Sequence, residues 1–241
     1  MWVNGLARAT PWAHAAMVTY AVWAGLVLLA AMLVGGWLWG RRQDDAPRVF
    51  ATALLAGVGV VVAVVLNKAV ITHLFERPRP CTTVHHALAL VPCTPDNAFP
   101  SDHALLAGAF AAGLLLLNRA LGTVAVVAAV FVAFGRVYIG MHHPGDVTAG
   151  ILLGALIAVV IVVALRGVAT RLAETLSRTA LRPVITAHEQ PSGRRALGPS
   201  AAPRTASSTA SFEPPPPPAV PDRPDTRVAS SGTAPRPPDR R

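Results

Sequence analysis

Five long apolar segments constrain the fold of this chain more than any other feature of its sequence. A helix needs about 20 apolar residues to cross a bilayer, and each segment reaches or approaches that length. Hydrophobic residues make up 53% of the chain and charged residues only 14%, which is unusual for a soluble domain. We therefore predict an all-α fold, a polytopic membrane bundle of about five transmembrane helices. The segments cover residues 14–39, 49–75, 103–117, 120–138 and 147–165.

Composition also divides the chain along its length. Residues 1–12 lack the layout of a signal peptide, and we interpret them as an interfacial segment ahead of a transmembrane domain over 13–166. In residues 167–182, apolar side chains recur at helical spacing opposite charged ones, which predicts an amphipathic helix on the inner leaflet. Residues 183–241 are rich in Pro, Ser, Ala and Arg, so we predict a disordered tail.

The basic residues indicate how the helices are oriented. The loop over 40–48 contains three arginines, and Arg119 lies between the third and fourth spans, so both loops are expected in the cytoplasm. The loops over 76–102 and 136–146 would then face outward. The protein is therefore expected to be a multi-pass protein of the cell membrane with its C-terminus in the cytoplasm.

The formal net charge of +9 belongs mostly to the tail. Twelve of the 21 Lys and Arg residues lie at or after position 166. Basic segments beside a membrane are attracted to anionic lipids, so inner-leaflet lipids are the expected partner of the tail. We favour this interpretation over nucleic-acid binding, and we expect no obligate protein partner.

Charged and imidazole side chains lie at the outward ends of the apolar runs. Such groups are costly near hydrocarbon and usually have a function there. Arginines, two histidines and one aspartate at one membrane face suggest a pocket for a phosphate-bearing lipid. The three segments concerned are Lys68 to Pro80, which includes Arg77 and Arg79, then Phe99-Pro100-Ser101-Asp102-His103, and finally Arg136 to Asp146, which includes His142.

These segments resemble the three signature motifs of the type 2 phosphatidic acid phosphatase superfamily. The third segment matches the motif of Arg, five residues, His, three residues and Asp. The second resembles the motif Pro-Ser-Gly-His, with Asp102 in place of glycine. Phe-Pro-Ser-Asp-His is similar to the bacitracin-resistance branch, the undecaprenyl pyrophosphate phosphatases. The resemblance covers roughly residues 1–165 and implies an integral membrane lipid phosphatase.

The phosphate-binding residues can be argued from chemistry. Phosphoryl transfer needs positioning and charge stabilisation, and guanidinium groups match phosphate oxygens. We therefore predict that Arg79 and Arg136 clamp the phosphate, with Arg77 as an auxiliary. Ser101 begins a helix after Pro100, so its hydroxyl and the free N–H groups there can hold an anion. The same hydroxyl can also cap the helix.

A nucleophile and an acid-base group complete the predicted site. A neutral imidazole can attack phosphorus when a carboxylate holds its other ring nitrogen, and His142 with Asp146 has the spacing for this, whereas His143 does not. The resemblance implies a phosphohistidine intermediate. His103 would protonate the leaving oxygen and then activate water.

Lys68 and Asp102 can each be interpreted in two ways. The superfamily usually has a lysine at the position that Thr72 occupies, and Lys68 lies one helical turn earlier on the same face. Lys68 either reaches the phosphate or faces an internal polar cavity. Asp102 either orients another side chain or caps its helix.

Neither a metal nor a cofactor is predicted. His73, His85 and His86 could contribute to a metal site, but no Cys or carboxylate pattern accompanies them, so we interpret them as loop histidines. Cys81 and Cys93 fall in the same outward loop. In an oxidising compartment, a disulfide between them is a reasonable hypothesis.

Three functions compete. The first is hydrolysis of undecaprenyl or another polyprenyl diphosphate at the outer face, which would recycle the carrier lipid for cell wall synthesis and confer bacitracin resistance. The second keeps the chemistry and changes the substrate to phosphatidic acid or phosphatidylglycerol phosphate. The third is a transporter that binds lipid phosphates without cleaving them. Binding alone would not require His142, His103 and Asp146 together, which favours an enzyme.

Overall fold

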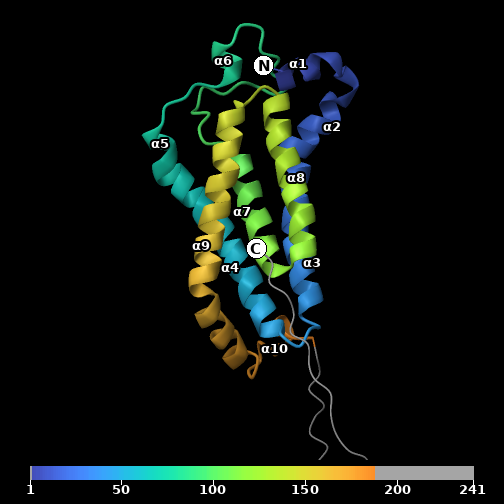
Figure 1. Ribbon diagram of the computed structural model, residues 1–241, viewed down its shortest axis with the longest axis vertical. Helices are drawn as coiled ribbons and strands as arrows, with labels where there is room; N and C mark the ends of the chain where they lie inside the picture. Colours follow the sequence, from blue (N-terminus) through green and yellow to red (C-terminus); the bar gives the residue numbers. More distant parts are fainter. Residues whose placement is uncertain (1, 188–241) are drawn as a thin grey trace, which may run out of the picture. The chain divides into compact units, whose positions relative to one another are not determined.

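Helices form the whole regular structure of residues 2–187, the part of the chain that the computed structural model describes (Figure 1). No strand occurs within these residues, so the predicted all-α fold is confirmed. The tail predicted over 183–241 falls outside the described residues from position 188 onward. The elements are α1 (Trp2–Ala9), η1 (Pro11–Ala13), α2 (His14–Thr19), η2 (Tyr20–Ala24), α3 (Gly25–Gly40), α4 (Ala46–Leu66), η3 (Asn67–Ile71), α5 (Thr72–Leu74), α6 (Pro80–Thr83), α7 (Asp102–Leu117), α8 (Arg119–Tyr138), α9 (Pro144–Leu176) and α10 (Arg182–Ile185).

Four helical stretches of the described chain are long and apolar enough to cross a membrane. They are Pro11–Gly40, Ala46–Leu74, Arg119–Tyr138 and Pro144–Leu176. The fifth predicted span is α7, which is apolar but shorter. Large aliphatic side chains such as Val61, Val127 and Leu152 are exposed on the outside of the bundle, as expected for a surface that faces lipid.

The short helix α7 lies at the centre of the bundle. In Figure 1 it stands between α8 and α9, with α3 and α4 close by, and it makes contacts with all four. A Cβ atom at Gly108 of α7 would collide with the backbone of Ile151, and one at Gly154 of α9 would collide with the backbone of Leu105. Small residues therefore let α7 and α9 approach closely, as is common between membrane helices.

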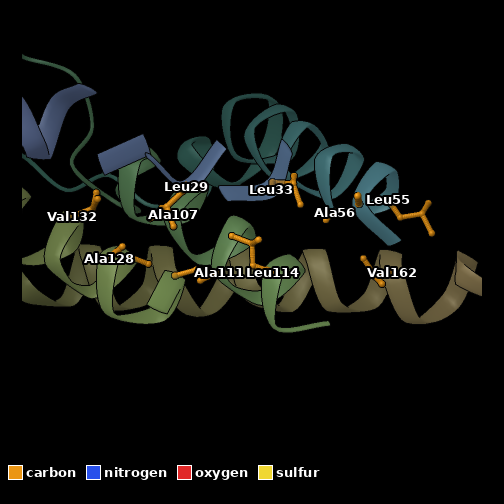
Figure 2. Packing of buried hydrophobic residues seen from close by; sticks show 13 residues of the cluster. Leu29, Leu33, Leu55, Ala56, Ala107, Ala111, Leu114, Ala128, Val132 and Val162 are labelled. Atoms are coloured by element: carbon orange, nitrogen blue, oxygen red, sulfur yellow. The ribbon is translucent and has the colours of Figure 1, made fainter. Parts of the chain in front are cut away.

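Aliphatic side chains fill the bundle toward the end distant from the loops over 75–101 and 139–143. Figure 2 shows Leu29 and Leu33 of α3 facing Ala107 and Leu114 of α7, with Val162 of α9 in the same cluster. These residues are buried, and their packing holds the spans together. The polar site at the other end is thus carried by a packed bundle.

The helix predicted over 167–182 differs in the structure. Residues 167–176 continue α9 without a break, and a turn separates them from α10. Nothing between Arg166 and Leu176 interrupts the helix, since the only glycine there, Gly167, is tolerated in a helix interior. The N–H of Ala187 donates to the Arg41 carbonyl at 2.8 Å, so the end of the described chain lies against the α3–α4 loop.

Candidate active site

Two loops build the site at the end of the bundle opposite α10. The first joins α5 to α7 and passes over the upper end of the bundle through α6, and the second joins α8 to α9 (Figure 1). The first loop is closed by a disulfide between Cys81 and Cys93. The carbonyl of Arg77 accepts a hydrogen bond from the Ala98 N–H at 2.8 Å, so the two ends of this loop lie side by side.

His142 is the centre of the site. Its Nδ1 lies 2.9 Å from the Ala98 carbonyl, which can only accept, so Nδ1 carries the proton and Nε2 keeps its lone pair. Arg79 Nη1 lies 3.1 Å from Nε2 and Arg136 Nη2 lies 3.3 Å from it. Two guanidinium groups therefore converge on the one nitrogen that could attack phosphorus.

Burial keeps this imidazole neutral. The His142 side chain is almost fully enclosed. Burial is the largest cause that lowers the pKa of His142 far below its usual range, and the positive charges of Arg136 and Arg79 add to it. The ring is therefore unprotonated at physiological pH, as a nucleophile must be.

Asp146 lies near His142, but its carboxylate accepts its hydrogen bonds from other residues. Its Oδ1 accepts from Arg77 Nη1 at 2.9 Å, and its Oδ2 accepts from the His143 N–H at 2.7 Å. The distance from Oδ2 to His142 Nδ1 is 4.0 Å. In this structure the Ala98 carbonyl, and not Asp146, makes the hydrogen bond that orients the His142 ring. Asp146 also fixes the first turn of α9, directly after His142 and His143.

Sequence reasoning missed Asp96. Its two carboxylate oxygens accept from Arg79, with Nε at 3.0 Å and Nη2 at 2.8 Å. The hydrogen bond with Arg79 is the largest cause that holds the pKa of Asp96 well below its usual range, so this carboxylate is ionised at neutral pH. Its one sequence signal is that it is the only acidic residue between Arg79 and Phe99.

Two buried donors of the site have no hydrogen-bond partner within residues 2–187. One is the Ser101 hydroxyl, which is fully buried, and the other is Nε of Arg136. Ser101 precedes α7 in the capping position, yet its side chain makes no capping hydrogen bond. Both donors are therefore free to bind phosphate oxygens.

Lys68 lies on a cavity that leads to His142. This cavity has a volume of about 260 Å³, and residues from η3, α5 and the first loop line it. Lys68 and Thr72 both line it, as does Arg79, so the two candidate positions for the superfamily lysine share one face of the helix. Lys68 Nζ is 2.5 Å from Asp102 Oδ2, so Asp102 orients a side chain.

His103 follows Asp102 in α7 and is partly buried. Its ring is hydrogen-bonded to the Val22 backbone in η2 and is close enough to Arg136 and His142 for their charges to interact. The structure therefore brings His103 within range of electrostatic interaction with His142 and Arg136, without a hydrogen bond between the two imidazole rings. Its predicted acid-base role stays a prediction.

Three further histidines lie in or near the first loop. No group of three or more His, Cys, Asp or Glu side chains within residues 2–187 is arranged to hold a metal ion. His73 lines the cavity beside Lys68. His85 and His86 lie near each other in the first loop, with ring centroids 6.0 Å apart.

The helical bundle and its basic, histidine-centred pocket are those expected of a membrane phosphatase. The model of the PAP2 superfamily matches residues 49–168. Undecaprenyl-diphosphatase BcrC of Bacillus subtilis (strain 168) is 31% identical over 160 residues, which cover 66% of this chain and 76% of that protein. The chain belongs to the PAP2 superfamily.

Other relatives are similar over part of the chain. The putative undecaprenyl-diphosphatase YbjG of Escherichia coli (strain K12) is 29% identical over 162 residues, 63% of this chain and 73% of that protein. A decaprenylphosphoryl-5-phosphoribose phosphatase of Mycobacterium tuberculosis (strain ATCC 25618 / H37Rv) is 37% identical over 117 residues, 48% of this chain and 62% of that protein. No solved structure matches the chain significantly.

Proposed function

We propose that the protein hydrolyses undecaprenyl diphosphate, or another polyprenyl diphosphate, to the monophosphate. The observation that carries this proposal is the convergence of Arg79 and Arg136 on Nε2 of a neutral His142. The relatives from Bacillus subtilis and Sulfolobus acidocaldarius, both named undecaprenyl-diphosphatase, support the choice of substrate. The reaction would return the carrier lipid to cell wall synthesis. A high level of this activity would confer bacitracin resistance.

The first step transfers a phosphoryl group to the enzyme. Nε2 of His142 attacks the terminal phosphorus while Nδ1–H stays on the Ala98 carbonyl. The bond from phosphorus to the bridging oxygen breaks, and its electron pair leaves with the polyprenyl monophosphate. Arg79, Arg136 and the Ser101 hydroxyl would stabilise the charge on the equatorial oxygens of the transition state.

The second step releases inorganic phosphate. Water attacks the phosphohistidine, the P–N bond breaks, and its electron pair returns to Nε2 of His142. In this proposal His103 protonates the leaving oxygen in the first step and takes the proton of the water in the second. Asp146 keeps the beginning of α9 and Arg77 in place throughout.

The proposal places the active site on the outer face of the membrane. Arginines in the loop over 40–48 and at Arg119 support a cytoplasmic position for the opposite end of the bundle. The disulfide of the active-site loop also supports an outward position, because disulfides persist in oxidising compartments. The basic C-terminal segment would then lie in the cytoplasm, beside anionic lipids.

A second candidate substrate is a lipid monophosphate. The relative named decaprenylphosphoryl-5-phosphoribose phosphatase, at 37% identity, favours it. The arrangement around His142 would serve such a substrate equally well, because it recognises the terminal phosphate. Phosphatidic acid and phosphatidylglycerol phosphate belong to the same class.

Phosphate release by the purified protein in detergent tests the proposal. A polyprenyl diphosphate, phosphatidic acid and phosphatidylglycerol phosphate are compared with EDTA present, and His142→Ala is the inactive control. We expect the highest kcat/KM with the diphosphate and no release by the variant. A preference for a monophosphate would move the function to phospholipid metabolism, and no release from any lipid would favour a binding or transport protein.

A further inference from the structure

Asp102 occupies the position at which the superfamily motif has glycine, and both of its carboxylate oxygens are used. Oδ2 lies 2.5 Å from Lys68 Nζ, and Oδ1 accepts from Asn67 Nδ2 at 2.7 Å. Asn67 is almost fully buried at the start of η3, so it is a fixed donor. Two contacts to one carboxylate hold Asp102 in one orientation, and Asp102 in turn pairs with the ammonium group of Lys68, whose side chain is 59% exposed.

Lys68 lines the cavity that reaches the nucleophile. Lys68 and Asp102 line this cavity of about 260 Å³ together with Arg79 and His142. An ammonium group has three N–H donors, and Asp102 uses one of them. Two donors of Lys68 are left for a ligand in the cavity.

The direction of attack assigns a ligand to Lys68. In phosphoryl transfer the attacking and leaving atoms are roughly in line with phosphorus. His142 Nε2 and the two guanidinium groups define the place of the terminal phosphate. The leaving group must then point away from His142, and the cavity that Lys68 and Asp102 line together with His142 gives it room.

We propose that Lys68, positioned by Asp102 and Asn67, binds the inner phosphate of a lipid diphosphate, the phosphate that leaves. This subsite makes the protein prefer diphosphates to monophosphates. The inner phosphate gains negative charge as the bridging bond breaks, and a cation beside it stabilises that charge. A monophosphate has no inner phosphate, so Lys68 adds little to its hydrolysis. The inference rests on the phosphatase function proposed above.

A matched pair of substrates tests the subsite. Kinetics are measured with a polyprenyl diphosphate and with the monophosphate of the same chain length, on the full-length protein in detergent. Lys68→Met should lower kcat/KM for the diphosphate about tenfold to a hundredfold, since a charged hydrogen bond is lost, and lower it much less for the monophosphate. Lys68→Arg should retain part of the preference. Asp44→Asn, which changes an exposed carboxylate in the loop between α3 and α4, is the control.

Asp102 is tested as a positioning residue by a double-mutant cycle. Asp102→Asn keeps the shape of the side chain and removes its charge, so the preference for the diphosphate should fall. The double variant with Lys68→Met should lose no more than Lys68→Met alone, because Asp102 acts through Lys68. If Asp102 had only a structural role, Asp102→Asn would instead lower kcat/KM equally for the diphosphate and the monophosphate.

Three results would overturn the subsite. Equal losses for the two substrates in Lys68→Met would show that Lys68 binds the terminal phosphate. Unchanged kinetics for both substrates would mean that Lys68 and Asp102 form a surface ion pair that binds no ligand. If the wild-type protein hydrolysed neither lipid, the proposed function itself would fail, and the subsite with it.

Discussion

At the scale of single residues, the site depends on the state of one imidazole ring. The Ala98 carbonyl holds the proton on Nδ1 of His142, and burial keeps the ring neutral. Arg79 and Arg136 then face the lone pair on Nε2. Replacing a group that makes one of these contacts should therefore change kcat/KM or the pH dependence of stability in a predictable direction.

Arg136→Lys should reduce kcat/KM about a hundredfold to a thousandfold, as removal of a preorganised donor commonly does. A lysine ammonium cannot reproduce the planar fork that presents Nη2 to His142 and leaves Nε for a phosphate oxygen. The measurement is steady-state phosphate release at several substrate concentrations. Arg119→Lys, at the first residue of α8 and thus at its other end, is the matched control. Equal activity of the two variants would show that Arg136 does not act in the site.

The neutral His142 also makes stability depend on pH. Its pKa in the folded protein lies below the ordinary value of 6.5, so below that pH the unfolded chain binds a proton that the folded protein does not. Stability should therefore be lost as the pH falls from 7 to 5, by at most about 1.4 kcal/mol per pH unit below 6.5. Thermal unfolding in detergent should show a smaller loss for His142→Asn. Identical losses in both proteins would mean that His142 is not held neutral.

At the scale of elements, the loop over 75–101 determines where the phosphate-binding groups lie. Asn97 organises it, since its Oδ1 accepts from the N–H groups of Arg77 at 2.9 Å and Phe99 at 3.2 Å. Its Nδ2 donates to the Thr72 carbonyl at 2.6 Å, which ties the loop to α5. The disulfide closes the same loop between Arg79 and Asp96. A loop held at several points can present rigid side chains.

Asp96→Asn should lower kcat/KM about tenfold, because Arg79 would lose a charged partner that fixes its guanidinium group. Steady-state kinetics with the diphosphate provide the test. Glu76→Gln, an exposed carboxylate of the same loop, is the control and should leave kcat/KM unchanged. A higher kcat/KM in Asp96→Asn would contradict a positioning role and show that Asp96 competes with phosphate for Arg79.

Some groups of the site could be predicted from the sequence, and others in this loop could not. The spacing from Arg136 to His142 and Asp146 follows from one local motif, so those residues could be selected without a structure. The Ala98 carbonyl carries no side-chain signal, and its place beside His142 depends on the path of the whole loop. Asp96 and Asn67 likewise acquire their roles only from tertiary contacts.

At the scale of the whole molecule, the helical bundle carries every residue assigned to the site. The apolar segments were predicted because their length and composition are local properties, and the structure confirms helices over all five. The position of α7 at the centre of the bundle was not predicted, since it depends on close contacts of Gly108, Gly150 and Gly154 with neighbouring backbones. Those contacts bring Ser101 and Asp146 together at 3.1 Å between backbone atoms.

Deletion of residues 188–241 should leave kcat/KM within about twofold, as expected for a change outside the segment that contains every residue assigned to the site. All residues assigned to the phosphate and to catalysis lie between Lys68 and Asp146. Phosphate release by the truncated and full-length proteins, compared at equal concentration in the same detergent, tests this expectation. A large loss on truncation would mean that the C-terminal segment contributes to the site.

The central claim is that Nε2 of His142 forms a covalent bond to phosphorus. The most direct measurement is rapid quenching after mixing the protein with a polyprenyl diphosphate labelled with ³²P at its terminal phosphate, followed by mapping of the labelled residue under alkaline conditions that preserve phosphohistidine. We predict label on His142 at Nε2, none in His142→Ala, and full labelling of the adjacent His143→Ala variant. Turnover with label on another residue, or sustained turnover by His142→Ala, would contradict this account.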